Sequence, residues 1–414
     1  MDVILSSVLG GLLSNVWFEL TFLLVVSLFA GFLFARFGQP RVLGYIIIGV
    51  IIGPSLLEII TAPASSTGGT SSPLPESVQI LAELGAIILL FMIGLECDLK
   101  EVYGKRSISI AVGGVIVPWV AGFFLAEALG FGAHAIFIGA TLVATSVAIT
   151  ASVTSQLGII GTPVAYAIVG AAVVDDVLGM VVLGISKGLL PGSSVDLTSI
   201  VLLLIGAMLF ITIGAWLGAR YLAKLVFNIQ VSGFRRKLPM SGFVLVLAIA
   251  FLYAFVAEVI GITALVGAFV AGTAFSSSPL RDGLRKGTQY MESLFVPLFF
   301  VSLGVAVNLR ETNLTDALTF GLALTLVAVV TKIVGCGIPA RLTGMSWWDS
   351  LAVGVGMTPR LEIALVIAYY GLSNKIIDDS VYSVVVLMGL LTAVFAPALL
   401  KRVLERGGHA LLPS

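Results

Sequence analysis

The adjacent carboxylates Asp175 and Asp176 constrain this chain more than any other feature. They lie inside an apolar run from about Pro163 to Ile185, which at ~1.5 Å per residue is long enough to cross a ~30 Å hydrocarbon core as a helix. Each ionised Asp at mid-membrane costs roughly 2.5–3.5 kcal/mol, so a pair persists only beside water, a cation or a buried positive partner. Neither a solvated loop nor a helix end suits this pair, because apolar or small residues flank it on both sides.

Two neighbouring residues on a helix point ~100° apart, so the two carboxylates cannot have the same surroundings. We expect one of them to face a cavity and the other to pair sideways with another helix. The pair is therefore the first candidate for a functional site.

The composition fixes the class of protein. Of 414 residues, 59% are hydrophobic and 11% are charged, whereas soluble domains have roughly 45–50% apolar and about 25% charged residues. The chain is expected to be an all-α polytopic membrane protein. Its zero net charge argues against nucleic acid as a partner. Cys97 and Cys336 fall in or beside different hydrophobic segments, so they give no disulfide framework and no metal-ligand spacing, and we interpret both as structural.

Hydropathy predicts thirteen membrane segments, at 15–37, 42–61, 79–97, 107–129, 133–156, 162–186, 197–226, 239–260, 262–277, 289–307, 315–340, 349–371 and 379–400. The N-terminus lacks the positive region of a cleavable signal, so we expect the first segment to start insertion. With the N-terminus outside, 17 Lys and Arg residues fall on the inner side, against Lys187, Arg310 and Lys375 on the outer side. This asymmetry predicts an outer N-terminus and a cytoplasmic C-terminus in the cell (inner) membrane.

A weak internal repeat relates the two halves of the chain. Residues 90–100 of the third segment mirror residues 300–310 of the tenth at a constant offset of 210, and 44–49 of the second similarly mirror 267–272 of the ninth. Segments two to six would then pair with nine to thirteen. Because segments two and nine run in opposite directions, the two five-helix units are expected to be inverted, as in many secondary transporters.

The fifth and twelfth segments correspond in this repeat, and both carry helix breakers or hydroxyls at mid-membrane depth. The fifth contains Thr145, Ser146 and Thr150, and the twelfth contains the run 354–362 with Pro359. Unwound backbone is tolerated there only where it lines a cavity or is buried in protein. Two crossing broken helices would aim carbonyls and half-helix dipoles at one site, to which the three hydroxyls add oxygens for a small hard cation. The alternative for each hydroxyl is a bond back to a helix carbonyl.

Lys332 stands in the middle of the eleventh segment. An uncompensated Lys there would lose its proton or be expelled, so we expect a carboxylate partner from the Asp pair; the alternative is a Lys that snorkels from a helix end. Arg360 and Glu362 are expected to neutralise the ends of the broken helix and to fix its packing. The remaining acidic and imidazole side chains near segment ends are interpreted as structural, with no histidine relay: Glu96, Glu127, Glu258, His134 and His409.

Together these features resemble a known family. The Asp175–Asp176 pair, Lys332 and the stretches 91–95, 294–304 and 358–362 are similar to the sodium/proton antiporters of the monovalent cation:proton antiporter superfamily, in the two-aspartate branch that includes NapA. The resemblance implies an NhaA-like fold with inverted repeats and a homodimer. It also implies that Asp176 binds the cation and the proton, while Asp175 pairs with Lys332. Position 361 departs from the pattern, because Leu stands where the family often has Gly.

The resemblance further implies a division of the chain. A dimerisation domain would comprise residues 1–106 and 231–312, a core ion-transport domain 107–190 and 313–414, and a linker helix 191–230. The chain ends soon after the last segment, without the nucleotide-binding domain fused to potassium-efflux relatives. That difference argues against a potassium-efflux system gated by a bound ligand, but it does not exclude potassium as a substrate.

The expected activity follows from competition at one charged site. A carboxylate in a partly wet cavity of low dielectric can hold a proton or a desolvated cation, and competition between the two yields exchange. We expect a secondary transporter, not an enzyme, that exchanges Na⁺ and Li⁺ for H⁺ electrogenically and uses no organic cofactor. The alternatives are a K⁺/H⁺ antiporter, a sodium-coupled organic-solute symporter and a cation channel.

Overall fold

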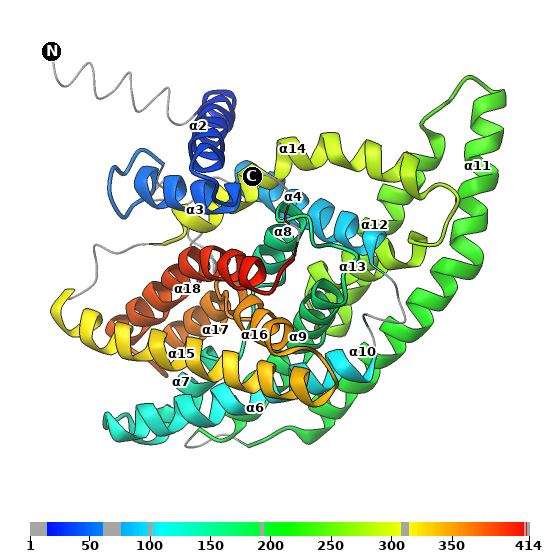
Figure 1. Cartoon of the computed structure of the whole chain (residues 1–414). Helices are drawn as coiled ribbons and strands as arrows, with labels where there is room; N and C mark the ends of the chain where they lie inside the picture. Colours follow the sequence, from blue (N-terminus) through cyan, green and yellow to red (C-terminus); the bar gives the residue numbers. More distant parts are fainter. Residues whose placement is uncertain are drawn as a thin grey trace, which may run out of the picture.

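A computed structural model describes residues 15–60, 76–97, 102, 104–190, 194–307, 314–409 and 411, and all regular structure in these residues is helical (Figure 1). The first half contains α2 (Val16–Arg36), α3 (Arg41–Ile52), α4 (Glu76–Glu96), α6 (Lys105–Ala128), α7 (Ala135–Thr141), α8 (Val147–Gln156) and α9 (Pro163–Gly188). The second half contains α10 (Leu197–Leu217), α11 (Ala223–Arg235), α12 (Ser241–Ile260), α13 (Ala264–Phe275), α14 (Arg281–Val305), α15 (Leu314–Leu342), α16 (Trp347–Gly356), α17 (Glu362–Ser373) and α18 (Asp379–Arg406).

Nine helical runs in these residues are long and apolar enough to cross a membrane. They match nine of the thirteen segments predicted from hydropathy. The other four are the short helices α3 and α13, and the two broken helices α7–α8 and α16–α17. The all-helical membrane class is confirmed, whereas the count of thirteen stays a prediction.

Four predicted boundaries are wrong by more than a helical turn. The seventh segment was expected to end at residue 226 and the thirteenth at 400, but α11 continues to Arg235 and α18 to Arg406. The tenth segment was expected to start at residue 289, but α14 begins at Arg281; its first turns are polar, and hydropathy alone cannot detect them. The second segment was expected to run to residue 61, but α3 ends at Ile52 and Gly53 is extended. Pro54 follows, and the residue before a proline is disfavoured in the helical region.

The helices pack as two groups. The first group is formed by α2, α3, α4, α12, α13 and α14, and the second by α6, α7, α8, α9, α15, α16, α17 and α18. Contacts between the groups gather where α8 meets α3 and α4 and where α18 meets α3. The run from α10 to α11 lies along one edge of the molecule (Figure 1), and five residues in a π-helical turn, Gly218–Leu222, join its two parts. The functions predicted for these parts of the chain stay predictions.

Glycines bring pairs of helices of the first group into close contact. A Cβ on Gly49 of α3 would lie 2.9 Å from the Cα of Gly304 in α14, and a Cβ on Gly94 of α4 would lie 2.9 Å from the Cα of Gly272 in α13. Only glycine fits at such distances, because side chains at these positions would collide with backbone. The ends of the longer repeated motif, at 98–100 and 308–310, lie outside the described residues.

Candidate functional site

The helix α9 places both aspartates near its middle. Its start is defined by Thr162, whose hydroxyl accepts a hydrogen bond from the Ala165 N–H at 3.3 Å, and by Pro163 in the first turn. Such a residue pair favours a helix start, because threonine caps the free N–H groups and proline has none to leave unpaired. Asp175 is 0% exposed and Asp176 is 2% exposed. The carboxylates are therefore deep in the protein as well as distant from the helix ends.

Lys332 on α15 pairs with Asp175, as expected from the sequence. Its Nζ lies 2.9 Å from Asp175 Oδ1, and both side chains are fully buried. The same ammonium donates to the carbonyl oxygens of Gly114 and Val143, each at 2.8 Å. All three ammonium protons thus have an acceptor, which is the arrangement that stabilises a charged lysine in a buried site.

The approach of Lys332 depends on a glycine in α6. A Cβ added to Gly114 would lie 3.4 Å from Lys332 Nζ, and it would collide with the sulfur of Cys336. A larger residue at position 114 would therefore displace the lysine or the cysteine. Cys97 and Cys336 are both buried, and neither forms a disulfide.

Asp176 faces the other helix group. Its Oδ2 accepts a hydrogen bond from the Thr263 hydroxyl at 2.5 Å. Thr263 precedes α13 and also caps it, since its oxygen accepts from the Val266 N–H at 3.4 Å. Sequence reasoning missed this residue. Its only signal was a threonine at the start of a short apolar segment, which indicates a helix cap but not a partner on another helix.

The two predicted helix breaks are present and cross each other. The chain is non-helical between α7 and α8 and again between α16 and α17. The Ser146 N–H donates to the Pro359 carbonyl at 2.7 Å. The hydroxyl of Thr145 donates to the Met357 carbonyl at 3.2 Å, and that of Thr150 to the Gly356 carbonyl at 3.0 Å. Each break thus satisfies polar backbone groups of the other, as buried irregular backbone requires.

Arg360 joins the two breaks. It is fully buried, and its Nε and Nη1 donate to the carbonyls of Leu142 and Thr358, each at 2.9 Å. Both carbonyls end a half-helix, where a positive charge is favourable. The guanidinium thus lies at the ends of both half-helices, and the neutralising role expected for Arg360 stays a prediction. Glu362 is the first residue of α17, and its side chain lies outside the described parts of the chain.

The three candidate hydroxyls differ in their surroundings. Ser146 caps α8, because its Oγ accepts from the Ile149 N–H at 3.1 Å, and Thr150 bonds to a carbonyl of α16. Both therefore hold the crossing together. Thr145 likewise bonds to a carbonyl of the other break, that of Met357. In the contacts observed, all three candidate hydroxyls therefore stabilise the crossing.

The side chains interpreted as structural lie away from this cluster. Glu96 forms an ion pair with Arg285 at 2.8 Å, and Glu127 and Glu258 are exposed near helix ends. His409 lies 2.8 Å from the carboxylate of Asp349.

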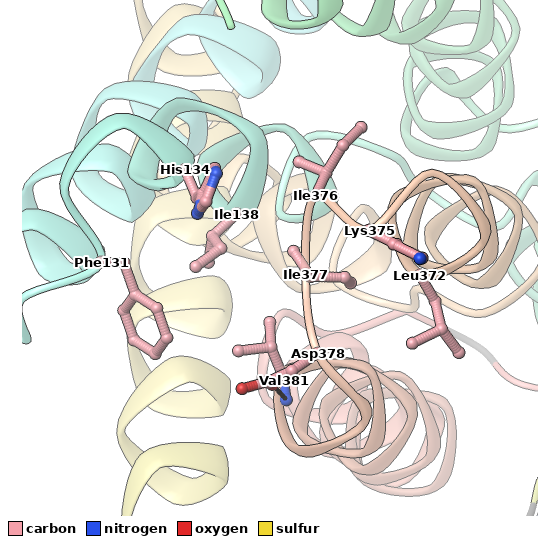
Figure 2. A pocket seen from close by; sticks show the side chains of 9 residues that line it. All are labelled: Phe131, His134, Ile138, Leu372, Lys375, Ile376, Ile377, Asp378 and Val381. Atoms are coloured by element: carbon pink, nitrogen blue, oxygen red, sulfur yellow. Dashed lines mark hydrogen bonds between the residues drawn. The ribbon is translucent and has the colours of Figure 1, made fainter. Parts of the chain in front are cut away.

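His134 lines a pocket of about 540 Å³ between α7 and the turn that connects α17 with α18 (Figure 2). The other residues that line it are Phe131, Ile138, Leu372, Lys375, Ile376, Ile377, Asp378 and Val381. A neighbouring cavity of about 390 Å³ includes Lys187, whose Nζ lies 3.5 Å from the centre of the Tyr370 ring. Neither cavity is lined by Asp175 or Asp176.

Comparisons with known proteins agree with this architecture. The transmembrane sodium/hydrogen exchanger family matches residues 23–406. The Na⁺/H⁺-K⁺ antiporter GerN of Bacillus cereus is 34% identical over 93% of this chain and 95% of its own length. A Na⁺/H⁺ antiporter of Enterococcus hirae is 31% identical over 92% of this chain and 96% of its own length.

Among solved structures, the sodium proton antiporter MjNhaP1 of Methanocaldococcus jannaschii has a similar fold. The TM-score is 0.67 at 17% sequence identity, and the match covers 95% of this chain and 97% of the other. At this identity the likeness concerns the fold alone.

Proposed function

The chain belongs to the sodium/hydrogen exchanger family, and on that premise we propose that it exchanges Na⁺ or Li⁺ for H⁺ across a membrane. The family is one of multi-pass membrane transporters, within the monovalent cation:proton antiporter superfamily. One observation carries the proposal. Of two adjacent buried carboxylates, Asp175 is paired with the Lys332 ammonium, whereas Asp176 contacts the neutral hydroxyl of Thr263.

Asp176 is proposed to bind the transported ion. A buried carboxylate can be neutralised by a proton or by a desolvated cation, but one charge cannot hold both. Protons that bind from one side then displace the cation toward the other. Sodium and lithium suit such a site because hard, small cations prefer carboxylate, carbonyl and hydroxyl oxygens. Asp175 and Thr145 are proposed to complete the site, while Ser146 and Thr150 support it through the crossing.

Lys332 is proposed to make the exchange electrogenic. Its ammonium is held by Asp175 and two backbone carbonyls. A cation bound at Asp176 would disturb the neighbouring Asp175 and weaken its attraction for the ammonium, which would allow Lys332 to release its proton. Two protons would then be exchanged for each cation.

Alternating access is proposed to occur by movement of the second helix group, which carries the aspartates and both breaks, against the first. We assign the first group with residues 1–106 and 231–312 to dimerisation, the second with 107–190 and 313–414 to transport, and 191–230 to the linker. Sparse packing between the groups supports this assignment. A homodimer of inner-membrane protomers is the assembly proposed with it.

The inverted repeat is supported by the glycine contacts. In the repeat, segment two corresponds to segment nine, and segment three corresponds to segment ten. A contact between segments two and ten therefore requires an equivalent contact between segments nine and three. The Gly49–Gly304 and Gly94–Gly272 contacts form such a pair. Segments four and eleven exchange with each other, and Gly113 of α6 and Gly335 of α15 approach closely in the same reciprocal manner.

The proposed membrane orientation is supported by which residues meet. Arg281, predicted on the inner side, donates to the carbonyl of Leu95 at 2.9 Å, and Lys401 donates to the carbonyl of Gly38. Lys187 and Lys375, both predicted outside, line one cavity. Residues assigned to one side of the membrane thus lie together in the fold.

A second candidate is K⁺/H⁺ exchange at the same site. It is favoured by the similarity to GerN, a Na⁺/H⁺-K⁺ antiporter. A direct test uses purified protein in sealed vesicles with an internal pH-sensitive dye, to which Na⁺, Li⁺ or K⁺ is added in turn. Saturable, cation-dependent proton movement with Na⁺ and Li⁺ supports the proposal. A response to K⁺ alone would favour the second candidate, and movement of cations without protons would reject both.

A further inference from the structure

One polar contact connects the proposed ion site to the opposite helix group. The Thr263 hydroxyl and Asp176 Oδ2 are 2.5 Å apart, a length typical of a hydrogen bond to an ionised acceptor, which is stronger than one between neutral groups. Thr263 precedes α13, and Asp176 belongs to α9. We call this contact the Thr263–Asp176 bridge.

The bridge joins helices from the two groups. Helix α13 packs mainly against α4 and α12, whereas α9 packs mainly against α6, α8, α7 and α16, and both contact α10. Movement of one group past the other, as alternating access requires, would separate Thr263 from Asp176. The bridge therefore holds the molecule in the arrangement shown in Figure 1.

Thr263 has little freedom to follow Asp176. Its oxygen also accepts from the Val266 N–H, and Gly261, two residues earlier, is in the left-handed conformation at the end of α12. The preceding turn and the cap thus fix Thr263 to the first group. Its hydroxyl donates to Asp176 Oδ2 and thus occupies a lone pair of an oxygen that a bound cation would coordinate.

We propose that Thr263 is a positioning residue that locks the cation-free transporter, and that the transported cation releases this lock by competing with its hydroxyl for Asp176. This inference rests on the proposed function. A cation at Asp176 offsets the negative charge that strengthens the bridge, so the loaded site separates from Thr263 more easily than the empty one. The consequence is that the ionised, empty site is retained on one side, which couples the movement of the protein to the presence of an ion.

The test replaces Thr263 by Val, which keeps the shape of the side chain but removes the hydroxyl. Binding is measured without transport, as the Na⁺ concentration that gives half of the thermal stabilisation of purified protein at alkaline pH, where protons compete least. Without the competing hydroxyl, this concentration should fall by about 3- to 10-fold, a fraction of what a hydrogen bond to a charged group can contribute. In vesicles, the variant should also move more Na⁺ per H⁺ than the wild type, because empty protein can now reorient.

Three further variants separate the bridge from helix capping. Thr162→Val removes a threonine cap of nearly equal hydrogen-bond length from α9 without touching the bridge, so it should leave the midpoint unchanged. Thr263→Gly lacks the hydroxyl but is accepted at a helix cap, and it should reproduce the Val result if Val folds poorly. Thr263→Ser keeps the hydroxyl and should behave as the wild type.

An unchanged midpoint and an unchanged Na⁺:H⁺ ratio in both Thr263→Val and Thr263→Gly would overturn the proposal. A higher midpoint would overturn it too, because it would make Thr263 a cation ligand and not a competitor. Failure of the proposed function gives a different pattern. If Na⁺ stabilises the wild-type protein but is not exchanged for H⁺, the proposed exchange is rejected. The Na⁺ midpoints of the Thr263 variants would still show whether the bridge competes with the cation. Wild-type protein that Na⁺ does not stabilise would reject both.

Discussion

Replacing Lys332 by Gln tests the energetics and the transport role of the buried ion pair together. The ammonium donates to Gly114 O, Val143 O and Asp175 Oδ1 at 2.8, 2.8 and 2.9 Å. A Gln amide has only two donors and no charge, so at least one acceptor loses its partner and Asp175 loses its counter-charge. Breaking a buried pair from one side costs about 3–5 kcal/mol.

That free energy corresponds to a measurable change in melting temperature. Unfolding entropy scales with chain length, and for 414 residues a change of 1 kcal/mol moves the midpoint by about 1 °C. Lys332→Gln should therefore melt about 3–6 °C below the wild type in detergent. Protonation of Asp175 in the variant would limit the loss, so the decrease should be largest at alkaline pH, where the carboxylate stays ionised.

A double-mutant cycle with Asp175→Asn isolates the pair. Asp175→Asn alone leaves a buried ammonium without a carboxylate, and the double variant leaves no charge in either position. The double variant should therefore be more stable than the sum of the two single losses predicts, by an interaction energy of about 1–3 kcal/mol. Additive losses would show that the two residues act independently, in disagreement with the 2.9 Å contact.

Transport by Lys332→Gln decides whether the lysine also carries charge. The coupling role predicts loss of electrogenic exchange in proteoliposomes, seen either as inactivity or as one-for-one exchange that ignores an imposed membrane potential. Full activity with an unchanged response to the potential would refute this reasoning. Lys332 would then be a structural strut, with both protons carried by the carboxylates.

Asp176→Asn should abolish sodium-driven proton flux while the protein still inserts and purifies as the wild type does, since the charge proposed to bind both ions is lost. Near-normal flux in folded protein would contradict the assignment. Gly114→Ala should lower the melting temperature by a few degrees and impair exchange, because a methyl group displaces Lys332 or its neighbour, whereas Gly283→Ala, with no atom within 4 Å, should do neither. In a cysteine-less background, a cysteine at Ser232 should resist an impermeant thiol reagent on intact cells and react in inside-out vesicles. The opposite labelling would reverse the proposed orientation.

Part of the site was predictable from the sequence, because an unpaired charge buried in the membrane has a high free-energy cost. A mid-membrane Lys332 needs a carboxylate, and the Asp pair supplies one, so the contact could be expected from the sequence alone. The two breaks could also be located from the sequence, because Thr145, Ser146 and Pro359 are residues that disfavour regular helix at mid-membrane depth. Fold class was accessible in the same way, from composition and segment length.

Other contacts depend on information that hydropathy does not contain. A hydropathy profile gives the depth of a residue in the membrane but not the rotation of one helix about another. The carbonyls of Gly114 and Val143 could not be assigned to Lys332, nor Thr263 to Asp176, because each contact depends on that rotation. For the same reason, the sequence could not show that Thr145 and Thr150 both bond to carbonyls across the crossing and not to their own helices.

The different partners of the two aspartates follow from their adjacency. On a helix, ~100° separates consecutive side chains, so Asp175 reaches α15, in the same helix group as α9, while Asp176 reaches the start of α13 in the other group. In the proposed movement of the groups, Lys332 would therefore travel with the aspartates, whereas the Thr263 contact would be broken. An adjacent pair thus combines, within one helical turn, a carboxylate whose partner lies in its own helix group and one whose partner lies in the other.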